Sequence, residues 1–205
     1  MGRDNNHDPQ ELRMNNPSEL KIPALVSRAL NLAEQMEYTG ECSYEVGRLL
    51  QVLVGQVHSG VVSELCAGCG VGTSWIATAL KPTTSFVTIE ADETHAAAVK
   101  RLVEPHLNIR VISGKWKTLL KEWKFSLFFA STYSERIEAQ AYLLNAMVPG
   151  GLIIMDGFPP RGKLSLGDSA TTAQLRDYWF SEPRVYAVEV QVSPMESVLL
   201  ATRRG

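Results

Sequence analysis

The spacing of hydrophobic positions changes near residue 60. Before that point, residues 23–38 and 43–57 are compatible with helices. The second segment carries apolar residues at i, i+3, i+4, i+7, i+8 and i+11, which places them on one stripe of a helix. The residues of this stripe are Val46, Leu49, Leu50, Leu53, Val54 and Val57. After residue 60, short apolar runs alternate with helix-compatible stretches, so the two parts of the chain are expected to build different structure.

The runs after residue 60 predict strands separated by helices. They are VVSEL (61–65), SFVTIE (85–90), IRVIS (109–113), FSLFFA (125–130) and GLIIMD (151–156). Between them, helical spacing is found over residues 72–80, 92–104, 115–122 and 134–147. The run FSLFFA has no polar alternation, which is typical of a strand buried on both faces of a parallel sheet. Strands that alternate with helices in this way predict a doubly wound α/β sheet.

The end of the chain departs from this alternation. A loop rich in Gly, Pro and Arg (157–167) leads to a predicted helix at 168–180. Two further predicted strands, 184–192 and 196–204, flank Ser193-Pro194-Met195, and so short a link favours antiparallel pairing. We therefore expect a seven-stranded, mostly parallel sheet with a C-terminal antiparallel hairpin. We expect a polar, mobile tail over 1–19 and one domain over 20–205, whose N-terminal helices occupy 20–58.

Composition narrows the class of protein. The chain has 205 residues, 45% apolar and 20% charged, which is enough for one domain with a full core. A formal net charge of −2, without a long basic run, argues against nucleic acid or a membrane surface as partner. No apolar segment is long enough to span a bilayer, and the N-terminus lacks the apolar run of a signal peptide. Three cysteines make no disulfide framework and favour a reducing cytoplasm.

The stretch SELCAGCGVGTS (63–74) allows three interpretations. Cys66 and Cys69 have the C-x-x-C spacing of a redox dithiol or of half a zinc site. Gly68 and Gly70 would let a ligand lie against the backbone, because they lack a Cβ. The third interpretation is a tight strand-to-helix turn with no ligand.

The position of this stretch favours a ligand. It lies at the first strand-to-helix junction, at the carboxyl edge where open α/β sheets bind ligands. Free backbone N–H groups at the start of the following helix suit a carboxylate or phosphate. Glu90 ends the next predicted strand twenty positions after Gly70, where a carboxylate can accept hydrogen bonds from both ribose hydroxyls of an adenosine.

The residues from Glu64 to Gly70, followed by Glu90, resemble the first two motifs of class I S-adenosylmethionine-dependent methyltransferases. The resemblance extends over about residues 43–204 and includes the turn VPGG before GLIIMD. ECSYEVGRLL upstream and VPGGLIIMDGF downstream are most similar to the catechol/caffeoyl-CoA-type O-methyltransferases. The resemblance implies the Rossmann-like methyltransferase fold, with S-adenosylmethionine as cofactor and S-adenosylhomocysteine as its product.

The resemblance also implies roles for matching positions. Glu64 would contact the methionine ammonium, the turn 66–73 would wrap the carboxylate end, Glu90 would hold the ribose, and SGKW (113–116) would lie beside the adenine. The expected cofactor-binding residues are Glu64, Cys66, Ala67, Gly68, Gly70, Thr73, Glu90, Lys115, Trp116 and Ser131. Cys66 stands where the family usually has its first glycine. We therefore favour small buried cysteines that line the cofactor loop. A redox dithiol stays open as the less favoured interpretation, and a zinc site is disfavoured.

Two departures from the family change the expected chemistry. The catechol-type enzymes bind a divalent metal through an aspartate after the fourth strand and an Asp-Asn pair after the fifth, whereas this chain has Ser131 and Asp156-Gly157. A hard cation prefers several oxygen ligands, so we expect no metal. Lys115 replaces an acidic residue that would accept from the adenine amine, and an ammonium has no acceptor. The adenine would then find its polar partners elsewhere, for example at the Trp116 backbone.

Asp156 is the favoured catalytic residue, as a general base at the carboxyl end of a strand. The alternative for Asp156 is a carboxylate that caps local N–H groups. Packing or solvent-facing roles are favoured for Tyr133, His58 and His95, and a solvated loop for Arg161 and Lys163, which could otherwise meet an anionic substrate.

The favoured function is metal-independent O-methylation of a small molecule. The alternative is a degenerate protein that binds the cofactor or serves as a scaffold without methyl transfer. A nucleotide-linked oxidoreductase is a third hypothesis, disfavoured because Thr73 stands where its third glycine belongs and because that fingerprint does not ask for Glu64. A small-molecule acceptor and possible homodimer pairing through the N-terminal helices follow from the resemblance.

Overall fold

The computed structural model describes residues 21–117, 121, 123–130, 133–161 and 170–205, with the backbone alone at 133–138 and 170–171. The tail expected at 1–19 and half of the helix expected at 115–122 lie outside this part of the chain. The helices are α1 (Ala24–Gln35), α2 (Tyr44–Gln56), α3 (Val71–Ala77), α4 (Glu93–Val103), α6 (Tyr133–Ala146) and α7 (Ala170–Ser181). The strands are β1 (Gly60–Leu65), β2 (Thr84–Glu90), β3 (Ile109–Ser113), β4 (Phe125–Ala130), β5 (Met147–Phe158), β6 (Val185–Gln191) and β7 (Ser197–Arg203).

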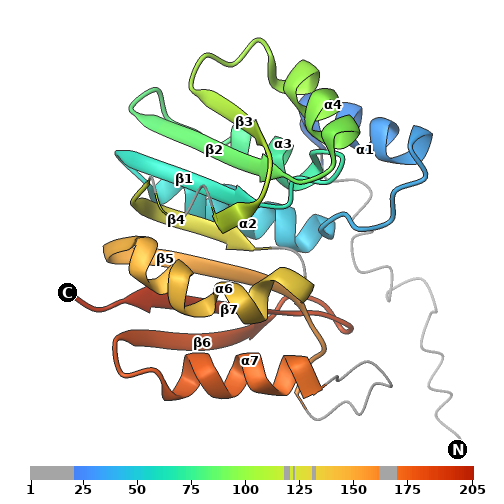
Figure 1. The fold of residues 1–205 in the computed structure, drawn as a ribbon. Helices are drawn as coiled ribbons and strands as arrows, with labels where there is room; N and C mark the ends of the chain where they lie inside the picture. Colours follow the sequence, from blue (N-terminus) through green and yellow to red (C-terminus); the bar gives the residue numbers. More distant parts are fainter. Residues whose placement is uncertain (1–20, 118–120, 122, 131–132, 162–169) are drawn as a thin grey trace, which may run out of the picture.

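One seven-stranded sheet organises the chain, with strand order β3-β2-β1-β4-β5-β7-β6 (Figure 1). The pairings among β1 to β5 are parallel, and β7 pairs antiparallel with both β5 and β6. This confirms the doubly wound sheet and its C-terminal hairpin. The strand order reverses between β1 and β4, so a crevice is expected outside their carboxyl ends.

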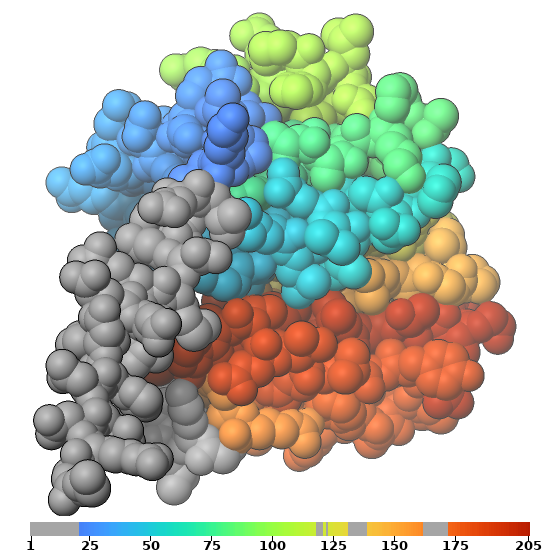
Figure 2. All heavy atoms as spheres, turned by 180° about the vertical axis from the view of Figure 1, so that it is seen from behind, coloured from blue at the N-terminus to red at the C-terminus, as the bar shows by residue number. Residues whose placement is uncertain are grey.

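Helices cover both faces of the sheet, with α6 and α7 in front in Figure 1 and α2 in front in the reverse view of Figure 2. The side chains of β4 show why helices have to pack on both faces of the sheet. Leu127 and Phe129 join the core beneath α2, while Phe128 joins the core beneath α6 and α7. The run FSLFFA is therefore buried on both faces, as predicted, except for the partly buried Ser126.

Helix α2 approaches α3 closely because Gly47 has no side chain. A Cβ at Gly47 would lie only 2.2 Å from Nε1 of Trp75, a side chain that is almost fully buried. Ser43 caps the start of α2, since its hydroxyl accepts a 3.3 Å hydrogen bond from the Val46 N–H. The first turn of α2 is thus capped, and the helix packs closely against α3, which follows the glycine-rich turn at residues 66–70.

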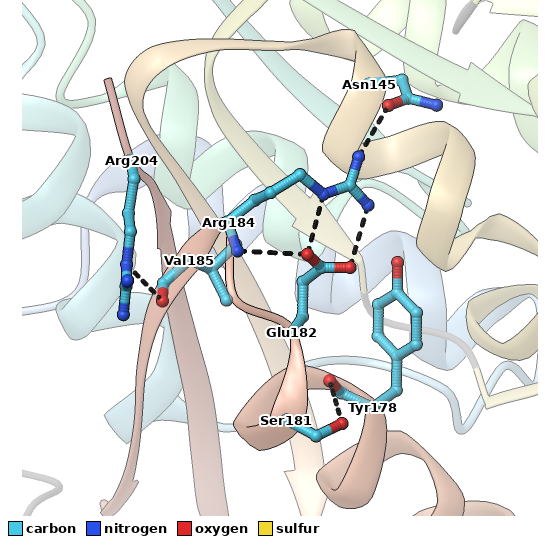
Figure 3. A network of polar contacts seen from close by, with 7 residues as sticks. All are labelled: Asn145, Tyr178, Ser181, Glu182, Arg184, Val185 and Arg204. Carbon is cyan, nitrogen blue, oxygen red and sulfur yellow. Dashed lines mark hydrogen bonds and ion pairs between the residues drawn. The ribbon is translucent and has the colours of Figure 1, made fainter.

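The junction from α7 to β6 is held by one arginine–carboxylate pair (Figure 3). Arg184 donates from Nε and Nη2 to the two carboxylate oxygens of Glu182, at 2.7 and 2.8 Å. Its Nη1 also donates to Oδ1 of Asn145, at 3.5 Å, which ties the junction to the end of α6. Hydrogen bonding from Arg184 lowers the pKa of Glu182 to about 2. This ion pair lies at the β6 edge of the sheet, four strands away from β1 and the turn that follows it.

Candidate functional site

The glycine turn between β1 and α3 requires three left-handed backbone conformations in five residues. Cys66 has φ +63°, Gly68 +54° and Gly70 +85°. Glycine adopts such angles without strain, whereas the Cβ of Cys66 makes its conformation costly by about 1–2 kcal/mol. The N–H groups of Cys66 and Ala67 both donate to the Ile89 carbonyl, at 2.9 and 3.3 Å. The turn is therefore anchored to β2, next to Glu90.

Glu64 lies beneath the turn and is almost completely buried. Its Oε2 accepts hydrogen bonds from the hydroxyls of Thr73 and Thr88, the latter at 2.9 Å. A Cβ at Gly72 would lie 2.4 Å from Oε1, so a glycine is needed there to make room for this carboxylate. No described residue donates a hydrogen bond to Oε1, which leaves that oxygen for a ligand.

Burial raises the pKa of Glu64 to about 7. The hydrogen bonds from Thr73 and Thr88 oppose this shift, while the nearby carboxylates of Glu90 and Asp156 add to it. A cationic group at Oε1 would favour the ionised form. The expected role of Glu64 toward an ammonium stays a prediction, and the Thr73 hydroxyl hydrogen-bonds the Glu64 carboxylate.

Glu90 ends β2 and connects the turn to the strand. Its Oε2 accepts from the Gly68 N–H at 2.8 Å, and its Oε1 accepts from the Asp92 N–H at 2.9 Å. A carboxylate has about four acceptor positions, so two remain for ribose hydroxyls. The two acidic residues that the sequence singled out thus lie at the carboxyl ends of neighbouring parallel strands, on either side of one turn.

A tyrosine that the sequence analysis did not single out covers this turn. A Cβ at Gly68 would lie 2.6 Å from the Tyr38 ring, and the ring meets His95 edge-on with centroids 5.2 Å apart. Burial raises the pKa of Tyr38 to about 12, and Glu90 adds to the shift. His95 therefore lies beside the site rather than on a purely solvated face. No sequence signal pointed to Tyr38, because its position depends on how the segment 36–43 crosses the turn.

The cavity above the turn is small. It measures about 10 Å³, room for a single water molecule, and Tyr38, Cys42, Glu64, Cys66 and Phe129 are among the residues that line it. An adenosyl group is far larger than this volume. Such a ligand does not fit into this cavity while the Tyr38 ring lies on Gly68.

All three cysteines line this small cavity. Of the two cysteines expected to be buried in the cofactor loop, Cys69 is buried, with its thiol 3.8 Å from the Met36 sulfur, whereas Cys66 is partly exposed. Cys42 is partly exposed as well. Burial nevertheless raises the pKa of the Cys42 thiol well above its ordinary value, and Asp156, Glu64 and Glu196 add to the shift. Burial also raises the pKa of Cys69. Protonated thiols are poor nucleophiles and metal ligands, which weakens the dithiol and zinc interpretations.

Asp156 lies near the carboxyl end of β5 and is 5% exposed. The next residue, Gly157, donates its N–H to Oε1 of Glu196 at 3.3 Å. Oε2 of Glu196 accepts a 2.6 Å hydrogen bond from the Ser43 hydroxyl. Glu196 therefore joins the start of α2, the end of β5 and the link between β6 and β7. The sequence analysis missed it, since only the folded chain brings these three segments together.

The other residues singled out from the sequence lie in different places. Lys115 is exposed, and the adjoining Gly114 N–H donates to the Glu90 carbonyl at 2.9 Å, so SGKW begins beside the site. Trp116 is buried and meets Tyr142 edge-on, with centroids 5.6 Å apart, so it packs against α6. Ser131 and Lys163 lie outside the described residues, as does the Tyr133 side chain. His58 is exposed. Arg161 is paired with Glu189 at 2.9 Å.

The acidic, histidine and cysteine side chains of the described residues do not gather into a metal site. Within the described part of the chain, no group of three or more His, Cys, Asp or Glu side chains is arranged to hold a metal ion. Nor is any helix among the described residues long and apolar enough to cross a membrane. Asp156 is followed by a glycine rather than an asparagine, and Ser131 lies outside the described residues, so the absence of a metal stays a prediction.

No family model and no curated protein sequence matches the chain. Its fold, however, matches solved structures. An O-methyltransferase from Bacillus cereus in complex with SAH has 22% sequence identity and a TM-score of 0.77, over 91% of this chain and 94% of that one. The O-methyltransferase TomG from Streptomyces achromogenes, involved in tomaymycin synthesis and solved with SAM, has 19% identity and a TM-score of 0.78, over 92% and 94%. The chain therefore has the class I methyltransferase fold found in these O-methyltransferases.

Proposed function

We propose that this protein binds S-adenosylmethionine across the turn 66–73 and transfers its methyl group to a small-molecule acceptor. The observation that carries the proposal is the placement of Glu64 and Glu90 on either side of this turn, with Oε1 of Glu64 free of partners among the described residues. Glu64 would hold the methionine ammonium and Glu90 the ribose. The matching folds of methyltransferases with SAM or SAH support the choice of cofactor.

Methyl transfer asks little covalent chemistry of the protein. The acceptor oxygen attacks the methyl carbon, the carbon–sulfur bond breaks, and its electron pair stays on sulfur. Aligning the two reactants supplies about 7–11 kcal/mol of the barrier reduction in favourable cases. We assign Asp156 as the base that takes the hydroxyl proton, a role typically worth about 10²–10⁴-fold in rate. The proposed transfer uses no metal, because Asp156 is followed by Gly157 instead of the asparagine that binds the metal in the catechol-type enzymes.

Calorimetry with S-adenosylhomocysteine tests the cofactor assignment. We expect saturable binding to the wild-type protein at micromolar concentrations. If heat changes stay at the level of dilution at high micromolar ligand, the cofactor assignment is wrong.

Mass spectrometry of reactions with phenolic and other hydroxylated acceptors tests the transfer step. Product should form in the presence of EDTA, and Asp156→Asn should slow the reaction by about 10²–10⁴-fold while S-adenosylhomocysteine still binds. Loss of product with EDTA would contradict metal independence. Binding without turnover of any acceptor would favour the alternative of a degenerate cofactor-binding protein.

A further inference from the structure

Two grooves flank the last turns of α4, at the edge of the molecule formed by α1, α4 and β3. One lies between α1 and α4, measures about 430 Å³ and is lined by Arg28 and Arg101 together with Leu32 and Leu102. The other lies between α4 and β3, measures about 470 Å³ and is lined by Lys100, Arg101, His106 and Arg110 above Val103 and Val111. Arg101 lines both. We call the pair the basic grooves.

The cations of the basic grooves are not neutralised by the protein. Arg28, Lys100, Arg101 and Arg110 form no side-chain ion pair or hydrogen bond with any described residue. By contrast, Arg161, Arg176 and Arg184 each pair with a glutamate at the other edge of the sheet. Glu104 is the one carboxylate among the described residues that line the grooves.

Local helix electrostatics explain only part of this cluster. Lys100 and Arg101 lie in the last turn of α4, where cations are favoured by the helix dipole. Arg28 comes from α1 and Arg110 from β3, so the dipole of α4 does not account for them. Four lysines and arginines line the two grooves against the single carboxylate of Glu104, in a chain whose formal net charge is −2. Positive charge is therefore concentrated at this edge of an acidic protein.

The shape and chemistry of the grooves select among anionic partners. No Phe, Tyr or Trp side chain lines either groove within the described residues, and His106 is the one aromatic ring there, so successive bases have no stacking platform. A lipid surface is flat and leaves concave grooves unfilled. Leucine and valine side chains form the apolar floors, and Leu107, in the turn between α4 and β3, is fully exposed. This combination fits an amphipathic polypeptide segment that carries carboxylates beside leucine-like side chains.

We propose that the basic grooves are a docking site for an acidic amphipathic helix of a partner protein. The groove between α1 and α4 adjoins the turn 66–73, because a Cβ at Gly70 would lie 3.1 Å from its lining residue Leu102. The basic side chains that line the grooves are, however, not among the residues proposed to hold the cofactor. The proposal therefore does not depend on methyl transfer.

Fluorescence anisotropy with a synthetic helical peptide tests the proposal. The probe is a labelled peptide of about 18 residues, five helical turns, with leucines on one face and glutamates on the other. We expect saturable binding that weakens as salt is raised. The double variant R101Q/R110Q should lose about tenfold in affinity, because two charges in contact with the peptide are removed. R203Q/R204Q removes the same charge from β7 and the chain end, and should bind within about twofold of wild type.

Several results would overturn the proposal. They are equal binding of a peptide with the same composition in scrambled order, tighter binding of a uridine-rich RNA or of phosphatidylserine vesicles, and equal loss of affinity in R203Q/R204Q. Thermal unfolding of both double variants checks their folding. If R101Q/R110Q is destabilised, Arg28→Gln, which changes the α1 side of the grooves, takes its place, and wild-type affinity in that variant would count against the proposal.

Discussion

The backbone N–H of Gly68 donates a 2.8 Å hydrogen bond to the carboxylate of Glu90, 22 residues further along the chain. The glycine turn and the end of β2 are therefore one unit, and the residue expected to hold the ribose also shapes the turn. A substitution at Glu90 is therefore expected to alter both the conformation of the turn and the proposed ribose site.

Glu90→Gln should weaken binding of S-adenosylhomocysteine by about 10–150-fold, because hydrogen bonds to a charged group contribute about 1.5–3 kcal/mol. Isothermal titration calorimetry measures the change. Asp92→Asn is the matched control. It removes a carboxylate two residues away, and asparagine can still cap α4 as Asp92 does through its 2.9 Å bond from the His95 N–H. Equal losses in the two variants would show that net charge, rather than the Glu90 position, controls affinity.

The pKa of about 7 at Glu64 predicts opposite pH dependences for stability and for binding. The folded-state pKa is raised above the ordinary 4.5, so the folded protein keeps a proton that the unfolded chain has released. Stability should therefore be greatest below pH 4.5, as far as this group is concerned, and fall as pH rises toward 7, by at most about 1.4 kcal/mol per pH unit. Cofactor binding should strengthen over the same range, because an ammonium prefers the ionised carboxylate. Urea unfolding and calorimetry across this range measure the two trends, and Glu64→Gln should flatten both.

Tyr38→Ala should accelerate the association of S-adenosylhomocysteine. The wild-type ring rests on Gly68 and has to leave before a ligand can lie on the turn. Stopped-flow fluorescence measures the rate. Tyr44→Ala, at an exposed tyrosine on the first turn of α2, should leave the rate unchanged. A slower association in Tyr38→Ala would mean that the ring contributes to the bound state instead of blocking it.

Two glycines of α2 predict opposite effects of the same substitution. Gly47→Ala should destabilise the protein by about 1–3 kcal/mol, because the added methyl group would overlap the buried Trp75 indole. Gly55→Ala meets nothing within 4 Å and should stabilise the protein by up to about 1 kcal/mol, since alanine favours helix over glycine. Chemical unfolding of both variants measures the difference. Similar values for the two would show that α2 does not press on α3 as described.

Local patterns in the sequence predicted most of the fold. Period and length identified the strands, because a run such as FSLFFA suits only a position covered on both faces. Element ends were less predictable. β5 extends from Met147 to Phe158 rather than over 151–156, and α3 ends at Ala77, because pairing with neighbouring strands and packing decide where an element stops.

The candidate site was predictable where one residue carries its own signal. Glu64, Glu90 and the glycines are readable from spacing, and the structure brings them together. Tyr38 and Glu196 were not, because each acts on residues that are distant in sequence. Tyr38 covers a glycine 30 positions away, and the Ser43–Glu196 hydrogen bond spans 153 positions. Such contacts depend on the assembled fold rather than on any local pattern.

The position of β7 between β5 and β6 sets an order on how the chain can assemble during synthesis. β6 lies at the end of the sheet and is translated before β7, its one neighbour in the described strand order. Until residues 197–203 have been made, β6 has no strand to pair with. Its side chains Tyr186, Val188 and Val190, which are exposed in the folded protein as well, then lie next to an open edge. A nascent chain paused at this stage exposes an unpaired strand with apolar side chains, so pausing there is expected to promote aggregation or to recruit a chaperone.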